Sequence, residues 1–209
     1  MNDSRLSELL VDGITQLGLS VTESQLRQLI SYKDILLRWN KVYSLTAITN
    51  PHDLIIQHLL DGLSIVNNIS NDAQVLDVGS GMGVPGIILA IMLPESKITV
   101  LDSNSKKSAF LQQVKIELNL INLTVICKRV ELYVPDKLFT VITSRAFADL
   151  TLFIQLTQHL LAERGCYLAM KAGRGLSEMK EINGFACRQI ELNVPYLDAK
   201  RFLIEMKRA

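Results

Sequence analysis

The chain has 209 residues, 48% of them hydrophobic, and a formal net charge of +1 at pH 7. This length and composition allow one packed domain with an extension, or at most two small domains. No apolar run reaches the roughly 18 residues that a membrane-spanning helix needs, and the N-terminal stretch lacks the apolar run of a signal peptide, so we expect a cytoplasmic protein with no membrane partner.

Residues 1–70 carry helical patterns only, and we predict a helical N-terminal extension there. Gly18 can end the first helix, and a capping box at 22–25 opens the second. Asn50 as N-cap, followed by proline at the first helical position, opens a third helix that runs to about residue 67.

From residue 74, short apolar runs alternate with helical patterns, which is typical of a parallel sheet covered by helices on both faces. The predicted strands are Val75–Val78, Lys97–Leu101, Leu123–Cys127, Phe139–Thr143, Cys166–Met170, Arg188–Val194 and Arg201–Met206, and the predicted helices are 84–93, 105–119 and 150–162. The last two strands have no helix between them and should form an antiparallel hairpin. We therefore predict an α/β domain over residues 71–209 with a seven-stranded, mostly parallel sheet.

The segment VLDVGSGMGVPGI (75–87) places three glycines at alternate positions between the first strand and the next helix, whose first turn holds Pro85. Such a turn is expected to aim free backbone N–H groups at a polar or anionic ligand. A Walker loop is excluded, because its Lys and Ser/Thr are missing. A dinucleotide-binding motif fits poorly, because Val84 stands where its third glycine belongs and the glycine falls one position early, at Gly83.

Two acidic residues frame this turn. Asp77, at the end of the first strand, can meet a cationic ammonium group. Asp102 closes the next strand, where a carboxylate can accept hydrogen bonds from both hydroxyls of a ribose. Each could instead cap a helix, but Ser103 or Ser105 is the better cap for the helix that follows, which leaves Asp102 for a ligand. The arrangement resembles the S-adenosylmethionine site of Rossmann-like, class I methyltransferases more closely than the cofactor site of a dehydrogenase, and the predicted strands agree.

The loop after the fourth strand reads TSRAFADL (143–150) and faces the methyl group in this class of fold. It lacks the Asn-Pro-Pro-aromatic motif of methylases that act on exocyclic amines. The chain also lacks the Pro-Cys nucleophile of carbon-5 pyrimidine methylases. The remaining acceptors are already nucleophilic at neutral pH, such as guanine N7, and their methylation needs in-line placement but no general base and no protein nucleophile.

Seven segments resemble, in chain order, the RsmG (GidB) family of bacterial 16S rRNA guanine-N7 methyltransferases. They are RWNKVYSLTAI (38–48), QHLLDGLSIV (57–66), LDVGSGMGVPGI (76–87), LDS (101–103), RVEL (129–132), SRAFA (144–148) and AMKAG (169–173). The likeness covers about residues 5–207. It implies a single methyltransferase domain behind a helical extension, which uses S-adenosyl-L-methionine to methylate one guanine of 16S rRNA in the small ribosomal subunit or its precursor. We expect a monomer.

The resemblance carries functional roles onto individual positions. The cofactor-binding residues would be Gly79, Gly81, Val84, Asp102, Val130, Glu131 and Arg145. Among them, Asp102 would hold the ribose, and the pair at 130–131 would meet the adenine. Gly79 and Val84 would lie against the methionine end of the cofactor.

Arg145 would lie between cofactor and RNA, and would bind both. The alternative for Arg145 is a purely structural salt bridge to a nearby carboxylate. Arg129 and Lys171 are expected to reach the same rim and are weaker candidates for binding an RNA phosphate.

The chain departs from the family pattern at Ser44, Met82 and Ala172. The first two are expected to change only local packing or loop shape, without effect on Arg145. Ala172 follows Lys171 beside the acceptor pocket and could change the freedom of the loop there.

Other side chains are interpreted as structural. His58 and Asp61 are one helical turn apart and could pair, with His58 a packed, hydrogen-bonded residue. Trp39 is expected to dock the extension on the sheet, and Asn40 to end the second helix. The three cysteines, Cys127, Cys166 and Cys187, are expected to be buried thiols of a reducing compartment. No group of residues has metal-ligand spacing, so no metal is expected.

Two other functions remain open. A small-molecule methyltransferase would usually carry a His or Glu base near its acceptor. A catalytically silent module that binds S-adenosylmethionine and RNA or a protein should have lost an acid or a glycine of the cofactor site. A near-neutral enzyme must bind RNA through local basic clusters. The candidate clusters are Lys128–Arg129, Arg174 with Lys180, Lys200–Arg201 and Lys207–Arg208.

Overall fold

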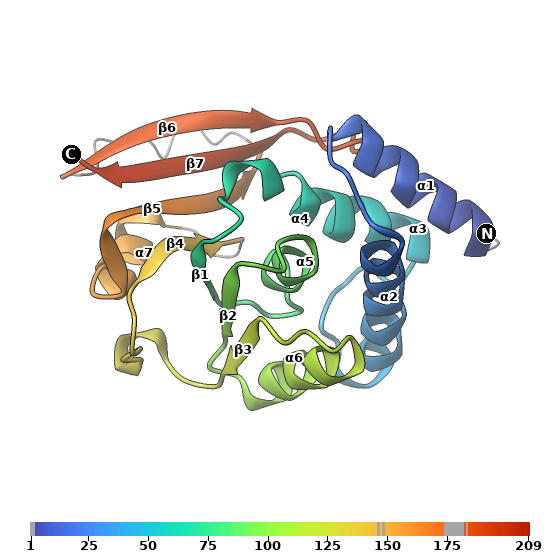
Figure 1. Ribbon diagram of the computed structural model, residues 1–209, viewed down its shortest axis with the longest axis horizontal. Helices are drawn as coiled ribbons and strands as arrows, with labels where there is room; N and C mark the ends of the chain where they lie inside the picture. The colour runs from blue at the N-terminus through green and yellow to red at the C-terminus, as the bar shows by residue number, and fades with distance from the viewer. Residues whose placement is uncertain (1–2, 146, 148, 174–181, 183) are drawn as a thin grey trace.

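The structure, a computed structural model, describes residues 3–145, 147, 149–173, 182 and 184–209. Among these residues, seven strands form one sheet in the order β3-β2-β1-β4-β5-β7-β6 (Figure 1). The strands are β1 (Gln74–Val78), β2 (Lys97–Leu101), β3 (Leu123–Ile126), β4 (Phe139–Ser144), β5 (Leu161–Ala172), β6 (Phe185–Leu192) and β7 (Arg201–Arg208). Strands β1 to β5 pair in parallel, whereas β7 is antiparallel to both β5 and β6. This confirms the predicted sheet and its terminal hairpin.

Helices cover both faces of the sheet (Figure 1). One face carries α1 (Asp3–Gln16), α2 (Glu23–Tyr43), α3 (Pro51–Leu54), α4 (Asp61–Leu63), α5 (Gly86–Met92) and α6 (Ser105–Glu117). The other face carries α7 (Leu150–Thr157) and the short 3₁₀ helix Val130–Leu132. Among the described helices, none combines the length and the apolar character that crossing a membrane requires.

The central strands send alternate side chains into two separate cores. Val75 of β1 and Val100 of β2 join the core under α1 to α6. Their sequence neighbours Leu76 and Leu101 join the core under α7. Because successive side chains of a strand point to opposite faces, a parallel sheet that is covered on both sides needs apolar residues at nearly every position. This explains the continuous apolar runs that marked the strands in the sequence.

Two helix starts differ from the prediction. α5 begins at Gly86 and Pro85 flanks its N-terminus, because the residue before a proline is kept out of the helical conformation. α6 is capped by Asn104 and not by Ser103 or Ser105. The Asn104 side chain accepts hydrogen bonds from two N–H groups of the first turn, at 2.9 and 3.3 Å.

The C-terminal third also differs in its boundaries. Residues 150–172 are divided so that α7 ends at Thr157 and β5 already begins at Leu161. The sixth strand covers 185–192 instead of the predicted 188–194, because that whole length pairs with β7. Both shifts move residues from predicted helix or loop into the ladder, where their backbone groups find partners.

The predicted third helix is present but changes its winding. Asn50 caps α3 and accepts a hydrogen bond from the N–H of His52 at 2.9 Å, as predicted. Residues 55–60 then form a π-helical segment, and α4 continues from it. π-Helical turns are rare and are found mostly at functional sites.

Trp39 docks the extension on α6 and not directly on the sheet, since its ring lies 5.7 Å from that of Phe110. Asn40 does not end α2, which continues beyond it. The Asn40 side chain exchanges two hydrogen bonds of 2.9 Å with the backbone of Thr46 and so holds the loop that follows. Ser44 ends the helix in the left-handed conformation, with φ of 49°.

The prediction of buried thiols is wrong for Cys127, which is exposed, and only partly right for Cys166 and Cys187, which are half-buried. Cys127 follows the last residue of β3, at the point where the chain leaves the sheet. The apolar run of a strand therefore ended one residue earlier than the sequence pattern indicated.

Three polar side chains of α2 bind backbone carbonyls at the ends of α5 and α6 and in the turn after β1. Gln25 donates to two carbonyls at the C-terminal end of α5, at 3.1 and 3.3 Å, and Gln28 donates to that of Leu118 at 2.8 Å. The hydroxyl of the buried Tyr32 donates to the carbonyl of Met82, in the glycine turn, at 2.6 Å. Helix C-termini expose carbonyls without partners within the helix. α2 thus satisfies such groups and supports the turn after β1.

Replacing Tyr32 by Phe should lower the free energy of unfolding by about 1–2 kcal/mol, because the Met82 carbonyl loses its donor while the ring remains. Urea denaturation measures this change. Tyr43→Phe, at a side chain that is 43% exposed, is the control and should change stability by less than about 0.5 kcal/mol. Equal losses in the two variants would contradict the role of this hydrogen bond.

Candidate functional site

The turn after β1 depends on three glycines with positive φ. Gly79, Gly81 and Gly83 have φ values of +68°, +58° and +93°, a region that other L-residues rarely adopt. A Cβ added to Gly79 would meet nothing within 4 Å, and one added to Gly81 only a backbone oxygen at 3.8 Å. A Cβ on Gly83 would instead lie 2.4 Å from the Ile87 side chain. The first two glycines therefore border open space, and the third allows close packing against α5.

The prediction of free N–H groups in this turn is wrong for the positions that matter most. Gly79 and Ser80 both donate to the carbonyl of Leu101, at 2.8 and 3.1 Å. Gly81 donates to Asp102 Oδ2 at 2.9 Å. Gly83 donates to the Ser80 carbonyl at 2.7 Å. The turn is thus held by the end of β2, and a ligand would meet its open edge and not a nest of donors.

Asp77 is fully buried beneath the turn. Its Oδ2 accepts a hydrogen bond from the N–H of Gly86 at 3.0 Å, while Oδ1 has no partner among the described residues. Burial raises the pKa of Asp77 to about 7. A buried carboxylate oxygen without a donor is costly. A cationic or hydrogen-bonding group that reached Oδ1 would relieve that cost, and the ammonium partner of Asp77 stays a prediction.

Asp102 is also buried and serves the local structure with both oxygens. Oδ1 accepts from the N–H of Asn104 and Oδ2 from that of Gly81, each at 2.9 Å. Lys107 Nζ lies 3.9 Å from Oδ2. Because each carboxylate oxygen can accept two hydrogen bonds, Asp102 keeps capacity for a ligand. The expectation that Asp102 is uncommitted is therefore too simple.

Asp102 borders a cavity of about 270 Å³, which we call the Asp102 hollow. Gly79 lies beside it, and so do Arg129, Val130 and Glu131 from the segment after β3. The hollow combines the carboxylate of Asp102, an apolar wall and the open edge at Gly79. Asp77, whose Oδ1 has no partner among the described residues, precedes Gly79 closely in the sequence. These features fit a nucleoside that carries a charged amino-acid tail, which is the chemistry of S-adenosylmethionine.

Val84 does not line the Asp102 hollow. Its side chain is 3% exposed and faces α4, where a Cβ added to Gly62 would lie 3.1 Å from Val84 Cγ1. A contact of Val84 with the methionine end of the cofactor would therefore involve its backbone.

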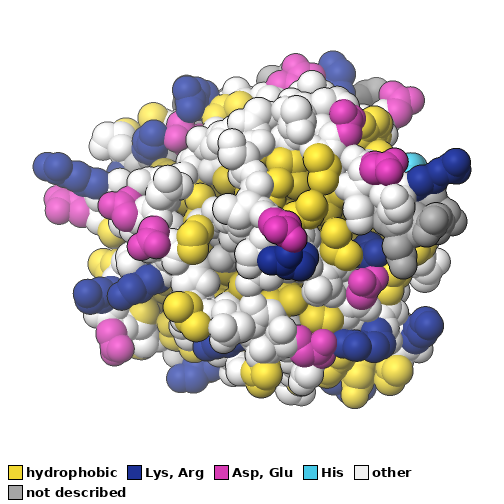
Figure 2. Space-filling model, turned by 45° about the vertical axis from the view of Figure 1, so that its right-hand side comes forward, with side chains coloured by type: hydrophobic (Ala, Val, Ile, Leu, Met, Phe, Trp, Pro, Cys, Tyr) yellow, Lys and Arg dark blue, Asp and Glu magenta, His cyan; other side chains and the backbone are white. Residues whose placement is uncertain are grey.

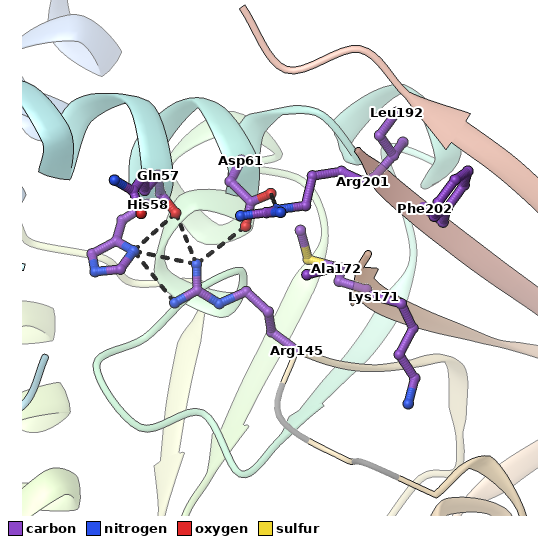
Figure 3. Close-up of a pocket in the computed structure, with 10 residues that line it drawn as sticks. Gln57, His58, Asp61, Arg145, Lys171, Ala172, Leu192, Arg201 and Phe202 are labelled. Carbon is purple, nitrogen blue, oxygen red and sulfur yellow. Dashed lines mark hydrogen bonds and ion pairs between the residues drawn. The ribbon is translucent and has the colours of Figure 1, made fainter. Parts of the chain in front are cut away.

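A second cavity of about 270 Å³, which we call the Asp61 cavity, is lined by Asp61, Arg145 and Arg201 among others (Figure 3). Arg145, which follows β4, points toward the π-helical segment and α4. Its Nη1 lies 3.2 Å from Asp61 Oδ2 and donates to the carbonyl of Gln57 at 3.2 Å. Arg201, at the start of β7, approaches Asp61 from the opposite side, with Nε 3.2 Å from Oδ1. Arg145 thus forms the salt bridge that was the structural alternative, and its role toward a substrate stays a prediction.

His58 lines the Asp61 cavity as a neutral residue. Burial and the charge of Arg145 lower the pKa of His58 to about 4. Its Nδ1 lies 2.9 Å from the carbonyl oxygen of Gln57 and 3.3 and 3.4 Å from the two Nη atoms of Arg145, and its Nε2 lies 2.8 Å from Thr46 Oγ1. His58 is therefore packed and hydrogen-bonded as predicted, but both His58 and Asp61 contact Arg145, and no hydrogen bond joins the two of them directly among the described residues.

The structure separates Arg129 and Lys171, which were predicted to reach one rim. Arg129 is exposed at the Asp102 hollow, whereas Lys171 lines the Asp61 cavity. Lys171 Nζ donates to the carbonyl of Phe147 at 2.7 Å. The strand ends that carry them lie on opposite sides of the loop after β4, which the sequence could not show.

Two features of the site were missed or underestimated by sequence reasoning. Arg201 was noted only as part of a basic cluster, and its ion pair with Asp61 joins residues that are far apart in the chain. Met82 was expected to affect local packing only, but its sulfur lies 3.9 Å from Arg145 Nη2 and its carbonyl binds Tyr32. Ala172 lies in the Asp61 cavity, as its predicted place beside the acceptor pocket implies.

Within the described part of the chain, no three His, Cys, Asp or Glu side chains are placed to hold a metal ion. The absence of a metal requirement stays a prediction. The basic cluster of Arg174 with Lys180 lies outside the described residues.

Comparisons with known proteins agree with the fold and the motifs. The model of a family described as rRNA small subunit methyltransferase G matches residues 25–203. A protein from Burkholderia lata named ribosomal RNA small subunit methyltransferase G is 47% identical, over 99% of this chain and 94% of that protein. A protein of the same name from a Janthinobacterium species is 45% identical, over 97% of this chain and 95% of its own length.

Solved methyltransferase structures share the fold at low sequence identity. The crystal structure of a SAM-dependent methyltransferase from Aquifex aeolicus superposes with a TM-score of 0.59 at 14% identity. The match covers 83% of this chain and 98% of that one. The sheet and its flanking helices therefore form a class I methyltransferase fold.

The pKa of Asp77 predicts a pH-dependent stability. Because the folded state binds the Asp77 proton more tightly than the unfolded state does, stability falls as pH rises from the ordinary value of 3.8 to about 7. The fall arises because, in that range, the unfolded state has released a proton that the folded state still holds. Asp77→Asn should remove this contribution, so urea denaturation should favour the variant more at about pH 8 than at about pH 5. The exposed Asp198→Asn is the control, and a pH-independent difference at Asp77 would contradict the assignment.

Asp102→Asn should weaken S-adenosylmethionine binding at least tenfold, about 1.4 kcal/mol, because the amide keeps one accepting oxygen where the carboxylate had two. Calorimetry measures the affinity, and thermal unfolding checks that the turn is intact. The exposed Asp136→Asn should bind as the unchanged protein does. Unchanged affinity in a folded Asp102 variant would remove Asp102 from the cofactor site.

Proposed function

This chain belongs to the rRNA small subunit methyltransferase G family, and we propose that it transfers a methyl group from S-adenosyl-L-methionine to N7 of one guanine in 16S rRNA. A family model that matches residues 25–203 and two relatives at 45% and 47% identity along nearly the whole chain support this proposal. The chain is accordingly an S-adenosylmethionine-dependent methyltransferase that acts on ribosomal RNA.

S-Adenosylmethionine, when bound, supplies an electrophilic methyl group on a positively charged sulfur. The residues that would hold it surround the Asp102 hollow. Asp102 would accept hydrogen bonds from the ribose, and Val130 and Glu131 would border the adenine. The unpartnered Oδ1 of Asp77 would face the ammonium of the methionine part, and the open edge at Gly79 leaves room for it.

The side chains that line the Asp61 cavity indicate which kind of methyl acceptor the site suits. His58 is neutral, with a pKa near 4, and both of its ring nitrogens have partners. Asp61 is engaged by two guanidinium groups. Among the described residues that line this cavity, neither His58 nor Asp61 is therefore available as a general base that removes a proton. Guanine N7 has an in-plane lone pair and no proton to lose, so this single observation favours N7 over an exocyclic amine or a hydroxyl.

Such a reaction depends on placement. The attacking nitrogen must be held in line and about 3–3.5 Å from the methyl carbon, and this positioning can supply about 7–11 kcal/mol of the barrier reduction. Arg145 would contribute by planar, bidentate contact with the substrate or the cofactor. A base in structured RNA must be unstacked or already exposed in a loop before its N7 can reach such a cavity.

RNA binding by a chain with a net charge of +1 requires local positive charge. Figure 2 shows acidic and basic side chains interspersed on the face that the N-terminal helices form. The Asp61 cavity, with Arg145, Arg201 and Lys171, is more basic than that face. We propose that the enzyme acts there on the small ribosomal subunit or its precursor, in the cytoplasm and as a monomer, with residues 1–70 as a helical extension of the domain at 71–209.

Cells that lack the gene should have 16S rRNA without one N7-methylguanosine, which the intact gene restores. Chemical mapping of N7-methylguanosine along 16S rRNA measures this. Arg145→Lys should restore less than about a tenth of the modification, a loss of about 1.4 kcal/mol in transition-state stabilisation, because an ammonium cannot reproduce the planar fork.

Arg188→Lys, an exposed arginine paired with Glu205, is the matched control and should restore the modification fully. A map that is identical with and without the intact gene would overturn the proposed function. Full modification by the Arg145 variant would leave that function intact and make Arg145 a structural ion-pair residue.

A further inference from the structure

Arg145 and Arg201 share a single buried carboxylate. The Asp61 side chain is 4% exposed, and its two oxygens each lie 3.2 Å from one of the guanidinium groups. Figure 3 shows the Arg145 side chain reaching Asp61 from below and that of Arg201 from the right of the view. Arg145 directly follows β4 and Arg201 begins β7, so Asp61 links the ends of two strands that are separated by β5 in the sheet.

The charges around Asp61 do not balance. Two guanidiniums face one carboxylate, and the neighbouring His58 is neutral, so the cavity holds a surplus of at least one positive charge before Lys171 is counted. The side chains of Arg145 and Arg201 are only 21% and 19% exposed. A partly buried charge without a counter-ion is unfavourable, and an incoming anion would remove that cost.

Arg201 has donors to spare. Its Nε is used by Asp61, and its Nη1 lies 3.4 Å from the carbonyl of Lys200, which is a long contact. Among the described residues, Nη2 of Arg201 has no hydrogen-bond partner. A guanidinium that is anchored through Nε and keeps its Nη groups for a ligand is pre-oriented for a phosphate.

Resting on the proposed function, we propose that Arg201 binds a backbone phosphate of single-stranded RNA next to the target guanine, in the Asp61 cavity, and that Asp61 positions Arg201 and Arg145 for this contact. The other possible source of an anion is the carboxylate of the cofactor. The two cavities share none of their lining residues, and Arg201 belongs to the one that does not include Asp102 or the glycine turn. An RNA phosphate is therefore the occupant for Arg201.

The test compares Arg201→Gln with Arg188→Gln. Arg188 lies on the same terminal hairpin and is also paired with a carboxylate, Glu205, but is 67% exposed and outside the cavity. Each variant is assayed for methyl transfer to small subunits from cells that lack the enzyme, for S-adenosylmethionine affinity by calorimetry, and for binding to 16S rRNA at several salt concentrations.

Arg201→Gln should raise KM for small subunits at least fivefold, leave cofactor affinity within about twofold, and make the salt dependence of RNA binding shallower by about 0.7, the slope of one phosphate contact on a single strand. Arg201→Lys keeps the charge and should recover the salt slope but not the full affinity. Arg188→Gln should match the intact protein in all three measurements. Urea denaturation identifies any variant that fails to fold, and Arg201→Lys then carries the comparison.

Three outcomes would overturn the inference. They are an unchanged KM and salt slope in folded Arg201→Gln, an equal effect of Arg188→Gln, or a loss of cofactor affinity that accounts for the loss of activity, which would assign the anion to the cofactor. Failure of the intact protein to methylate small subunits would instead overturn the proposed function itself.

Discussion

The bridge from Asp61 to Arg145 and Arg201 joins three parts of the chain that lie far apart in the sequence. Asp61 comes from the helical extension, Arg145 from the end of β4, and Arg201 from the start of β7. Removing one partner of a buried ion pair costs more than the pair contributes, because a charge is left without compensation. The bridge therefore ties the position of the extension to the geometry of the Asp61 cavity.

The cofactor turn is held in a comparable way from two directions. From the sheet side, the carbonyl of Leu101 and the carboxylate of Asp102 take the N–H groups of the glycine turn. From the helical side, Tyr32 of α2 binds the carbonyl of Met82 in the same turn. A turn whose polar groups are already satisfied has little freedom to rearrange, so a ligand would meet a preformed edge at Gly79 and Gly81. The extension is thus part of the structure that shapes the glycine turn.

The chemistry that this arrangement supports is one of placement. The Asp61 cavity contains a neutral histidine and a carboxylate engaged by two arginines, and its surplus charge is positive. Such a site is poorly suited to remove a proton and well suited to hold an anion. Both properties are compatible with methylation of guanine N7. The N7 nucleophile needs no deprotonation, and the RNA carries a phosphate on either side of the guanosine. Under the proposed function, the Asp61 cavity would receive the RNA and the Asp102 hollow would receive the cofactor.

The sequence alone determined the features that depend on local patterns. Alternation of apolar runs and helical stretches predicted the seven strands, and the motifs at 76–87 and 144–148 predicted the methyltransferase fold and family. Local rules could not place element ends correctly, because the limits of α7 and β6 are set by pairing with distant strands. Nor could they show that Asp61 engages Arg145 and Arg201, that Tyr32 supports the glycine turn, or that Arg129 and Lys171 line different cavities. Each of these depends on residues that are fifty or more positions apart or on opposite sides of one loop, and only the packed sheet decides which of them meet.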